Sequence, residues 1–482
     1  MKRFFGIITI LIIMTACRPS LIDDFSGDHV TTEYNFPKIF ESFWHGMNRN
    51  YLFWDIEPGP SWQPVLDSLP SGMRSYVKNN PTAFWDRIYD FYKPQFDELG
   101  SVSIMNPNFS AAAAKAYGYL YSMTLGLRDG HFRISFEGSL GMPEIWHSTD
   151  RKIMGYFQED PIAASGVFYF SDLTESTVTY NVLLPQDAFN PDAYFRTYDF
   201  VEQVIKPYID GSFYNEIASD VILDPNMRLA WGEINNSGGG IILYISYNFC
   251  MMYDVHNSSS FPFNTAVYDG IRSALASFLD ALENPNVRGI IFDIRGNTGG
   301  NPADIGFFWG RMINAPLVYA ESRSKSGEGR LDYSPWAPVR VMPAPSSEKK
   351  LRNIGIPIVM LVEGGTASGA EFIVMGTKAY QNGHVVGTTT AGAASNTVEP
   401  VMYNGGAFSG GPFWTRVSGA VVQYRGAKEK IVYEGVGIKP DVEVKMEKAD
   451  WDNFFKQPGA ANSGKDKQLE AAIRVIDPGR TF

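Results

Sequence analysis

The chain has 482 residues, of which 44% are hydrophobic and 19% are charged. This composition is that of a folded protein with a large core, and the length allows about two to four domains. The net charge of -11 argues against a nucleic-acid partner, because phosphate binding requires a concentrated basic face and the sequence has no basic cluster.

The N-terminus has the pattern of a targeting segment, with Lys2 and Arg3 ahead of the apolar run Phe4–Met14 and a small-residue ending at Cys17. It resembles a bacterial lipoprotein signal over residues 1–17. This resemblance implies export to the cell envelope and a membrane anchor through lipidation of Cys17. A plain secretory signal and an uncleaved anchor remain alternatives. The other cysteine, Cys250, has apolar neighbours and is expected to be a buried small hydrophobe.

Residues 18–130 are predicted to form a tether followed by an N-terminal helical domain, because aromatic residues recur there at helical spacing. Asp129 and Gly130 then form a turn signal, so His131 is expected where a turn enters a strand. A lone histidine is more often structural than catalytic, and both readings stay open. Asp129 either supports His131 or only forms the turn.

Residues 131–230 form a β-containing middle region whose fold the pattern does not define. Strands are expected at Val167–Phe170 and Thr177–Leu184, and a helix at Tyr198–Lys206.

Alternating strands and helices over residues 231–450 predict an α/β core with a mixed sheet. A strand at Val287–Ile294 leads into the glycine-rich turn Arg295–Pro302 and then a helix. Such a turn either cradles a phosphate or brings backbone N–H groups to a reacting carbonyl. The P-loop lysine is missing, which disfavours a nucleotide. Asp293 and Arg295 are expected to brace the turn as a pair.

A second strand, turn and helix unit occupies Pro357–Lys378 and places Ser368 at the turn. In one interpretation Ser368 and Glu371 form a helix capping box. In the other, Ser368 is the exposed nucleophile of a sharp turn and the N–H of Gly369 faces an oxyanion. Because ligands gather at the carboxyl ends of strands in α/β sheets, both turns should meet at one sheet edge.

The remaining pattern predicts strands at His384–Gly387, Trp414–Tyr424 and Lys430–Tyr433, and a turn that begins at Glu434. The last segment, residues 451–482, should contain a helix at Asp466–Ile476.

Four motifs occur in a shared order, namely DIRGNTGG at Asp293–Gly300, GGTASGAE at Gly364–Glu371, VVGTTTAG at Val385–Gly392 and EGVGIKPD at Glu434–Asp441. Together they resemble the tail-specific serine peptidases, which include the C-terminal processing and tricorn-like peptidases. The resemblance implies a hydrolase of the serine protease class. The processing branch uses a serine-lysine dyad, and the position of that lysine holds Ala393 in this chain.

The tricorn-like branch is more similar, because its histidine and glutamate correspond to His131 and Glu434. The resemblance implies that His131 is the base for Ser368, that Glu434 orients it, and that Gly369 with Gly299 or Gly300 forms the oxyanion hole. Asp129 and Glu371 would support the site. The tricorn pattern has a second serine beside its histidine, and this chain has Gly130 there.

The predicted function is therefore an exported serine endopeptidase that cleaves peptides or protein tails, without a cofactor or a metal. One alternative is an inactive relative that binds a peptide or an apolar ligand on the same fold. The other is a structural envelope protein, which would have no open cleft around Ser368.

Overall fold

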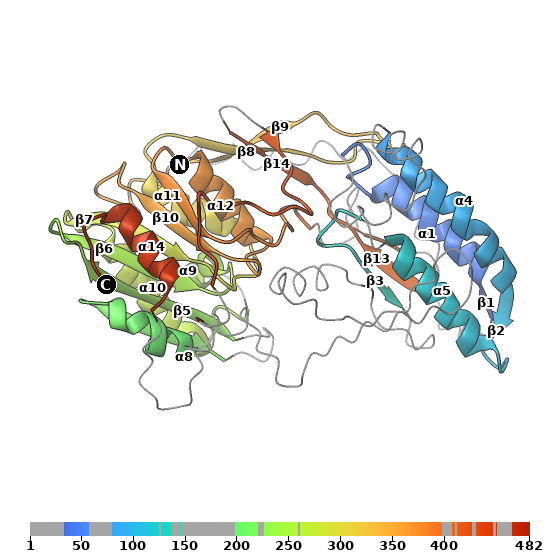
Figure 1. Ribbon diagram of the computed structural model, residues 1–482, viewed down its shortest axis with the longest axis horizontal. Helices are drawn as coiled ribbons and strands as arrows, with labels where there is room; N and C mark the ends of the chain where they lie inside the picture. Colours follow the sequence, from blue (N-terminus) through green and yellow to red (C-terminus); the bar gives the residue numbers. More distant parts are fainter. Residues whose placement is uncertain are drawn as a thin grey trace, which may run out of the picture.

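Figure 1 shows the computed structural model of the chain, with a helical region and an α/β core at opposite ends. The structure describes residues 33–56, 80–124, 127–136, 145, 198–219, 226–258, 261–397, 407–409, 412–426, 430–446, 450 and 465–482. The predicted signal segment and the strands expected at Val167–Phe170 and Thr177–Leu184 lie outside these residues. Among the described helices, none is both long and apolar enough to cross a membrane.

Three helices and a short hairpin-like pair of strands make up the helical region. They are β1 (Glu33–Asn35), α1 (Phe36–Asn50), α4 (Pro81–Leu99), β2 (Ser101–Ser103) and α5 (Phe109–Thr124). The side chain of Asn35 caps α1 by accepting from the N–H of Lys38 at 2.9 Å. Aromatic side chains fill the core between the helices, as in the stacked pair Trp44 and Trp85 with ring centroids 4.9 Å apart. The predicted helical domain is confirmed.

The α/β core is built on a mixed sheet of seven strands in the order β16-β11-β10-β7-β6-β5-β4. Neighbours from β16 to β6 run parallel, whereas β5 and β4 join the edge in antiparallel fashion. The strands are β4 (Phe213–Ala218), β5 (Met227–Asn235), β6 (Ile241–Tyr247), β7 (Val287–Asp293), β10 (Ile358–Val362), β11 (Gly383–Gly387) and β16 (Val442–Glu443). This architecture confirms the predicted α/β fold.

Helices cover both faces of this sheet, which explains why its central strands are apolar throughout. In β10, Met360 faces one cluster of buried side chains and Leu361 faces another. The first cluster is closed by α9 (Met252–Asn257), α10 (Asp269–Ala281), α11 (Ala303–Met312) and α12 (Gly369–Ala379). The second is closed by the helical segment that begins with α8 (Tyr198–Phe200) and by α14 (Lys467–Ile476).

Two smaller sheets lie between the helical region and the core. One has the order β12-β13-β3, and the other has the order β15-β14-β8-β9. Their strands are β3 (Arg133–Phe136), β8 (Leu317–Arg323), β9 (Ala337–Val341), β12 (Ala407–Ser409), β13 (Phe413–Arg416), β14 (Val421–Arg425) and β15 (Lys430–Ile431). The prediction of one strand over Trp414–Tyr424 is wrong, because the chain leaves the first sheet after Arg416 and enters the second at Val421.

The boundaries of the core also differ from the predicted ones. Strand β4 joins the large sheet although it precedes residue 231, and α14 packs against the same sheet. The C-terminal helix is thus a layer of the core.

Candidate active site

Ser368 lies at the sharp turn between β10 and α12. Its backbone angles are φ 55° and ψ -125°, a conformation that side-chain-bearing residues rarely adopt. Strand β10 lies beside β7 in parallel register, so this turn meets the glycine-rich turn that follows β7 at the same sheet edge. Both the exposed turn and the shared edge were predicted from the sequence, and the strained geometry is that of a nucleophile presented by a strand-to-helix turn.

His131 faces Ser368 across 237 intervening positions in the sequence, with its Nε2 3.1 Å from the serine Oγ. The histidine lies in the turn between α5 and β3, at the end of the helical region. This distance permits direct proton transfer between the two groups.

Asp129 holds the turn that carries His131. Its Oδ1 accepts from the N–H of His131 at 2.9 Å and from the hydroxyl of Ser418 at 2.8 Å. Its Oδ2 accepts from the N–H of Ser418 at 2.6 Å. Asp129 therefore ties the turn to the segment between β13 and β14, a tie beyond simple turn formation.

Glu434 lies beside this turn and is fully buried. Its Oε1 accepts from the N–H of Gly130 at 2.5 Å. One ligand atom from each of Asp129, His131 and Glu434 lies within 4.8 Å of the others. Burial raises the pKa of Glu434 well above its usual range, and the nearby charge of Asp129 adds to this effect.

Glu371 connects the nucleophile turn to the loop that follows β11. It accepts from the N–H of Ser368 at 3.3 Å, as the predicted capping box requires. It also accepts from the N–H groups of Gly392 and Ala393, at 2.9 and 2.7 Å, and from the hydroxyl of Thr390 at 2.5 Å. Burial raises the pKa of Glu371, while these donors act in the opposite direction. The capping residue is thus also the anchor of this loop.

The glycine-rich turn lies directly against Ser368. A Cβ on Gly299 would fall 2.6 Å from the Cβ of Ser368, so only glycine allows this approach. The N–H of Gly299 donates to the side chain of Asn297 at 2.9 Å. A Cβ on Gly369 would lie 3.3 Å from the nitrogen of Gly300, so the backbone of these two residues is adjacent.

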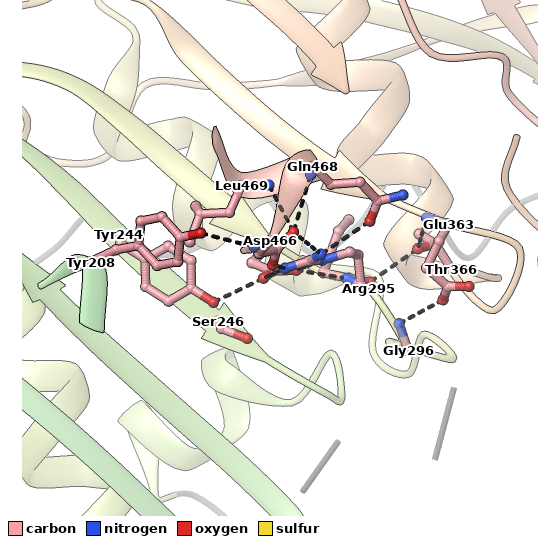
Figure 2. Close-up of polar contacts among 12 residues, drawn as sticks. Tyr208, Tyr244, Ser246, Arg295, Gly296, Glu363, Thr366, Asp466, Gln468 and Leu469 are labelled. Carbon is pink, nitrogen blue, oxygen red and sulfur yellow. Dashed lines mark hydrogen bonds and ion pairs between the residues drawn. The ribbon is translucent and has the colours of Figure 1, made fainter. Parts of the chain in front are cut away.

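Buried charges brace the start of this turn, as Figure 2 shows. Arg295 forms ion pairs with Asp293 at 2.6 Å and with Asp466 at 2.7 Å. Asp466 also caps α14 by accepting from the first-turn N–H groups of Gln468 and Leu469. The predicted pairing of Asp293 with Arg295 is present, and the C-terminal helix shares it.

Glu363 joins the two turns to each other (Figure 2). Its Oε1 accepts from the N–H of Gly296 at 2.7 Å, and its Oε2 accepts from the N–H of Gly365 at 2.9 Å. The glycine-rich turn and the Ser368 turn are therefore held as one rigid unit.

A cavity of about 280 Å³ opens beside Ser368 and Gly369. Pro302, Phe372 and Ala420 contribute apolar surface, and further small polar residues complete a lining without a charged side chain. An open pocket at Ser368 is contrary to what the structural-protein alternative predicts.

Several residues of the site carry no signal in the sequence that reveals them. Ser418 and Thr390 are ordinary polar residues of loops, and their partners are 289 and 19 positions away. Asn297 belongs to the predicted glycine turn, where its short amide suits a turn, yet its bond to Gly299 depends on the folded loop. Cys250 is buried as predicted, and its N–H donates to the carbonyl of Gly299 at 2.8 Å.

Comparison with solved structures finds a candidate peptidase from Parabacteroides merdae, with a TM-score of 0.52, 16% identity, and coverage of 92% of this chain and 97% of that chain. A candidate S41 protease from Bacteroides fragilis gives a TM-score of 0.35 and 20% identity over 52% of this chain and 58% of that chain. Mature CPAF gives a TM-score of 0.46 and 11% identity over 93% and 98%. No curated protein matches the chain.

The family comparison is more specific than these likenesses of fold. Residues 259–444 match the model of peptidase family S41. This segment includes Ser368, Glu371, Glu434 and both glycine-rich turns, and it excludes His131. The chain therefore belongs, through residues 259–444, to peptidase family S41, the tail-specific family, and is a serine peptidase.

Proposed function

We propose that this peptidase acts through a Ser368, His131 and Glu434 arrangement of the tricorn-like type. The observation that carries the proposal is the 3.1 Å separation of His131 Nε2 from Ser368 Oγ. A serine-lysine dyad is disfavoured because Ala393 stands at the position where the processing branch has its lysine.

In this mechanism the Oγ of Ser368 attacks the carbonyl carbon of the scissile peptide while its proton passes to Nε2 of His131. The C–N bond then breaks, and His131 returns the proton to the leaving amine. Water enters, gives a proton to His131 and releases the acyl group as a carboxylic acid. Glu434 helps orient the turn of His131 and stabilises the imidazolium when ionised.

The N–H groups of Gly369 and Gly300 are the proposed donors to the oxyanion. Gly300 is preferred to Gly299 because the N–H of Gly299 already donates to Asn297. Backbone donors of this kind commonly contribute factors of about 100 or more in rate.

The uncharged cavity beside Ser368 suits a small or apolar substrate side chain, and the substrate is proposed to be an extended peptide or a protein tail.

Replacing Ser368 with alanine tests the catalytic assignment. We expect loss of peptide hydrolysis and of labelling by a serine-reactive phosphonate, with an unchanged circular dichroism spectrum. The matched control is Ser326→Ala, a serine of the loop between β8 and β9 outside the site, which should retain activity. Hydrolysis by purified S368A protein at the wild-type rate would refute the role of Ser368.

We also propose that the protein is exported and anchored to the membrane through Cys17. The support is the sequence pattern of residues 1–17. A fatty-acid label should enter the wild-type protein and not the Cys17→Ala variant, which should leave the membrane fraction. Equal labelling of the two proteins would contradict the anchor.

A further inference from the structure

Two small residues meet at the point where the helical region contacts the core. A Cβ added to Gly130 would lie 2.7 Å from the Cβ of Ala393 and 2.9 Å from its Cα. It would also lie 3.1 Å from Oε1 of Glu434. Separations below about 3 Å are repulsive for carbon atoms, whose optimal contact is at about 3.5–4.0 Å. The backbone of Gly130 therefore occupies space that any side chain would need.

Glycine is required at position 130 for space alone. The described residues with positive φ do not include Gly130, so its backbone conformation is open to other residues. Its N–H bond to Glu434 would also survive a substitution. Replacement by alanine thus changes little except the contact with Ala393.

The position of Ala393 is fixed from the other side. Its N–H donates to Glu371 at 2.7 Å, and Glu371 lies in the first turn of the helix that begins directly after Ser368. The same carboxylate binds Gly392 and Thr390, so the loop cannot easily retreat. Contacts therefore run without a gap from Ser368 through Glu371 and Ala393 to Gly130, the neighbour of His131.

We propose that Gly130 and Ala393 are a matched pair of positioning residues that sets the distance between His131 and Ser368. The proposal rests on the proposed catalytic role of these two residues. A larger side chain at either position would push the turn of His131 away from the nucleophile. The two departures from the related motifs, glycine in place of serine and alanine in place of lysine, thus belong to one contact.

The first test is Gly130→Ala. A displacement of about 1 Å at a catalytic group can cost about 100-fold in rate, so we expect kcat to fall about 10- to 100-fold with KM nearly unchanged. Ala393→Gly in the same chain removes the opposing Cβ and should recover at least about 10-fold of this loss. Gly306→Ala is the control, because a Cβ at this helical glycine meets nothing within 4 Å.

Ala393→Val makes the same test from the other side of the contact, should G130A protein fold poorly. We expect a comparable loss of kcat. Wild-type kcat in the folded G130A and A393V variants would overturn the proposal, as would failure of A393G to restore any activity to folded G130A protein. A purely structural role would lower the melting temperature without this rescue of kcat.

Crystal structures of G130A and of the G130A/A393G double variant separate this proposal from the proposed function. The distance from His131 Nε2 to Ser368 Oγ should lengthen in the single variant and return toward 3.1 Å in the double variant. This measurement does not depend on hydrolysis. An unchanged distance in G130A would refute the positioning role even if Ser368 is the nucleophile, whereas an inactive wild-type enzyme with the expected distances would refute only the catalytic role.

Discussion

At the scale of single residues, the site combines a strained nucleophile with buried carboxylates that hold its surroundings. A side-chain-bearing residue in the conformation of Ser368 costs about 1–3 kcal/mol. Glu371 and Glu363 bind the turn on both sides and oppose its relaxation. The strain is thus sustained by contacts that the sequence reveals only in part, since the capping box could be predicted and the loop anchored by Glu371 could not.

Glu434 gives a prediction that separates stability from activity. Burial raises its folded-state pKa above the unfolded value of about 4.3. The folded protein therefore holds this proton more tightly, and the resulting stability is present below about pH 4 and is lost as pH rises through the folded pKa. Glu434→Gln cannot ionise and keeps an oxygen for the N–H of Gly130. We expect the variant to be more stable than wild type at pH 8 and about 10-fold or more less active.

Urea unfolding across pH 4 to 8, followed by fluorescence, checks the stability part. The difference between E434Q and wild type should shrink as the pH falls. Glu443→Gln changes an exposed glutamate and serves as the control. A variant that is less stable than wild type at pH 8 would mean that Glu434 is a net stabilising carboxylate in the folded protein.

At the scale of elements, local patterns predicted the catalytic units well. The apolar runs of β7 and β10, each followed by a glycine-rich turn and a helix, specify two strand-turn-helix units, and parallel pairing brings the turns together. The strand expected over Trp414–Tyr424 failed for a physical reason. Ser418 bonds to Asp129, and this long-range bond redirects the chain between two sheets in a way that alternation of side chains does not encode.

The C-terminal helix illustrates the same limit. Its amphipathic stripe and the aspartate at its start could be read from the sequence. The partner of Asp466 could not, because Arg295 lies 171 positions away and already has Asp293 as a neighbour. Burying one arginine between two aspartates links α14 to the oxyanion turn, so an element expected to be separate supports the site.

At the scale of the whole molecule, the two catalytic partners come from different regions. His131 follows the helical region and Ser368 lies in the core, so the contacts between the regions define the site. The loop between β8 and β9 supplies many of them. Arg323 binds Asp55 at 2.8 Å and lies over the ring of Tyr333. Such pairings between distant segments were not predictable from local sequence.

Arg330 provides the test of this coupling. Its guanidinium lies 5.8 and 5.4 Å from the ring centroids of Trp44 and Trp54, and it donates to Asp86 at 2.8 Å. Arg330→Ala should lower the free energy of unfolding by about 1–3 kcal/mol, because cation-π contacts and an ion pair are lost together. We also expect a several-fold fall in kcat, since the region that carries His131 is held less firmly. Urea unfolding and peptide hydrolysis measure the two effects, with the exposed Arg352→Ala as control. Loss of stability with wild-type kcat would show that this loop joins the regions without setting the catalytic geometry.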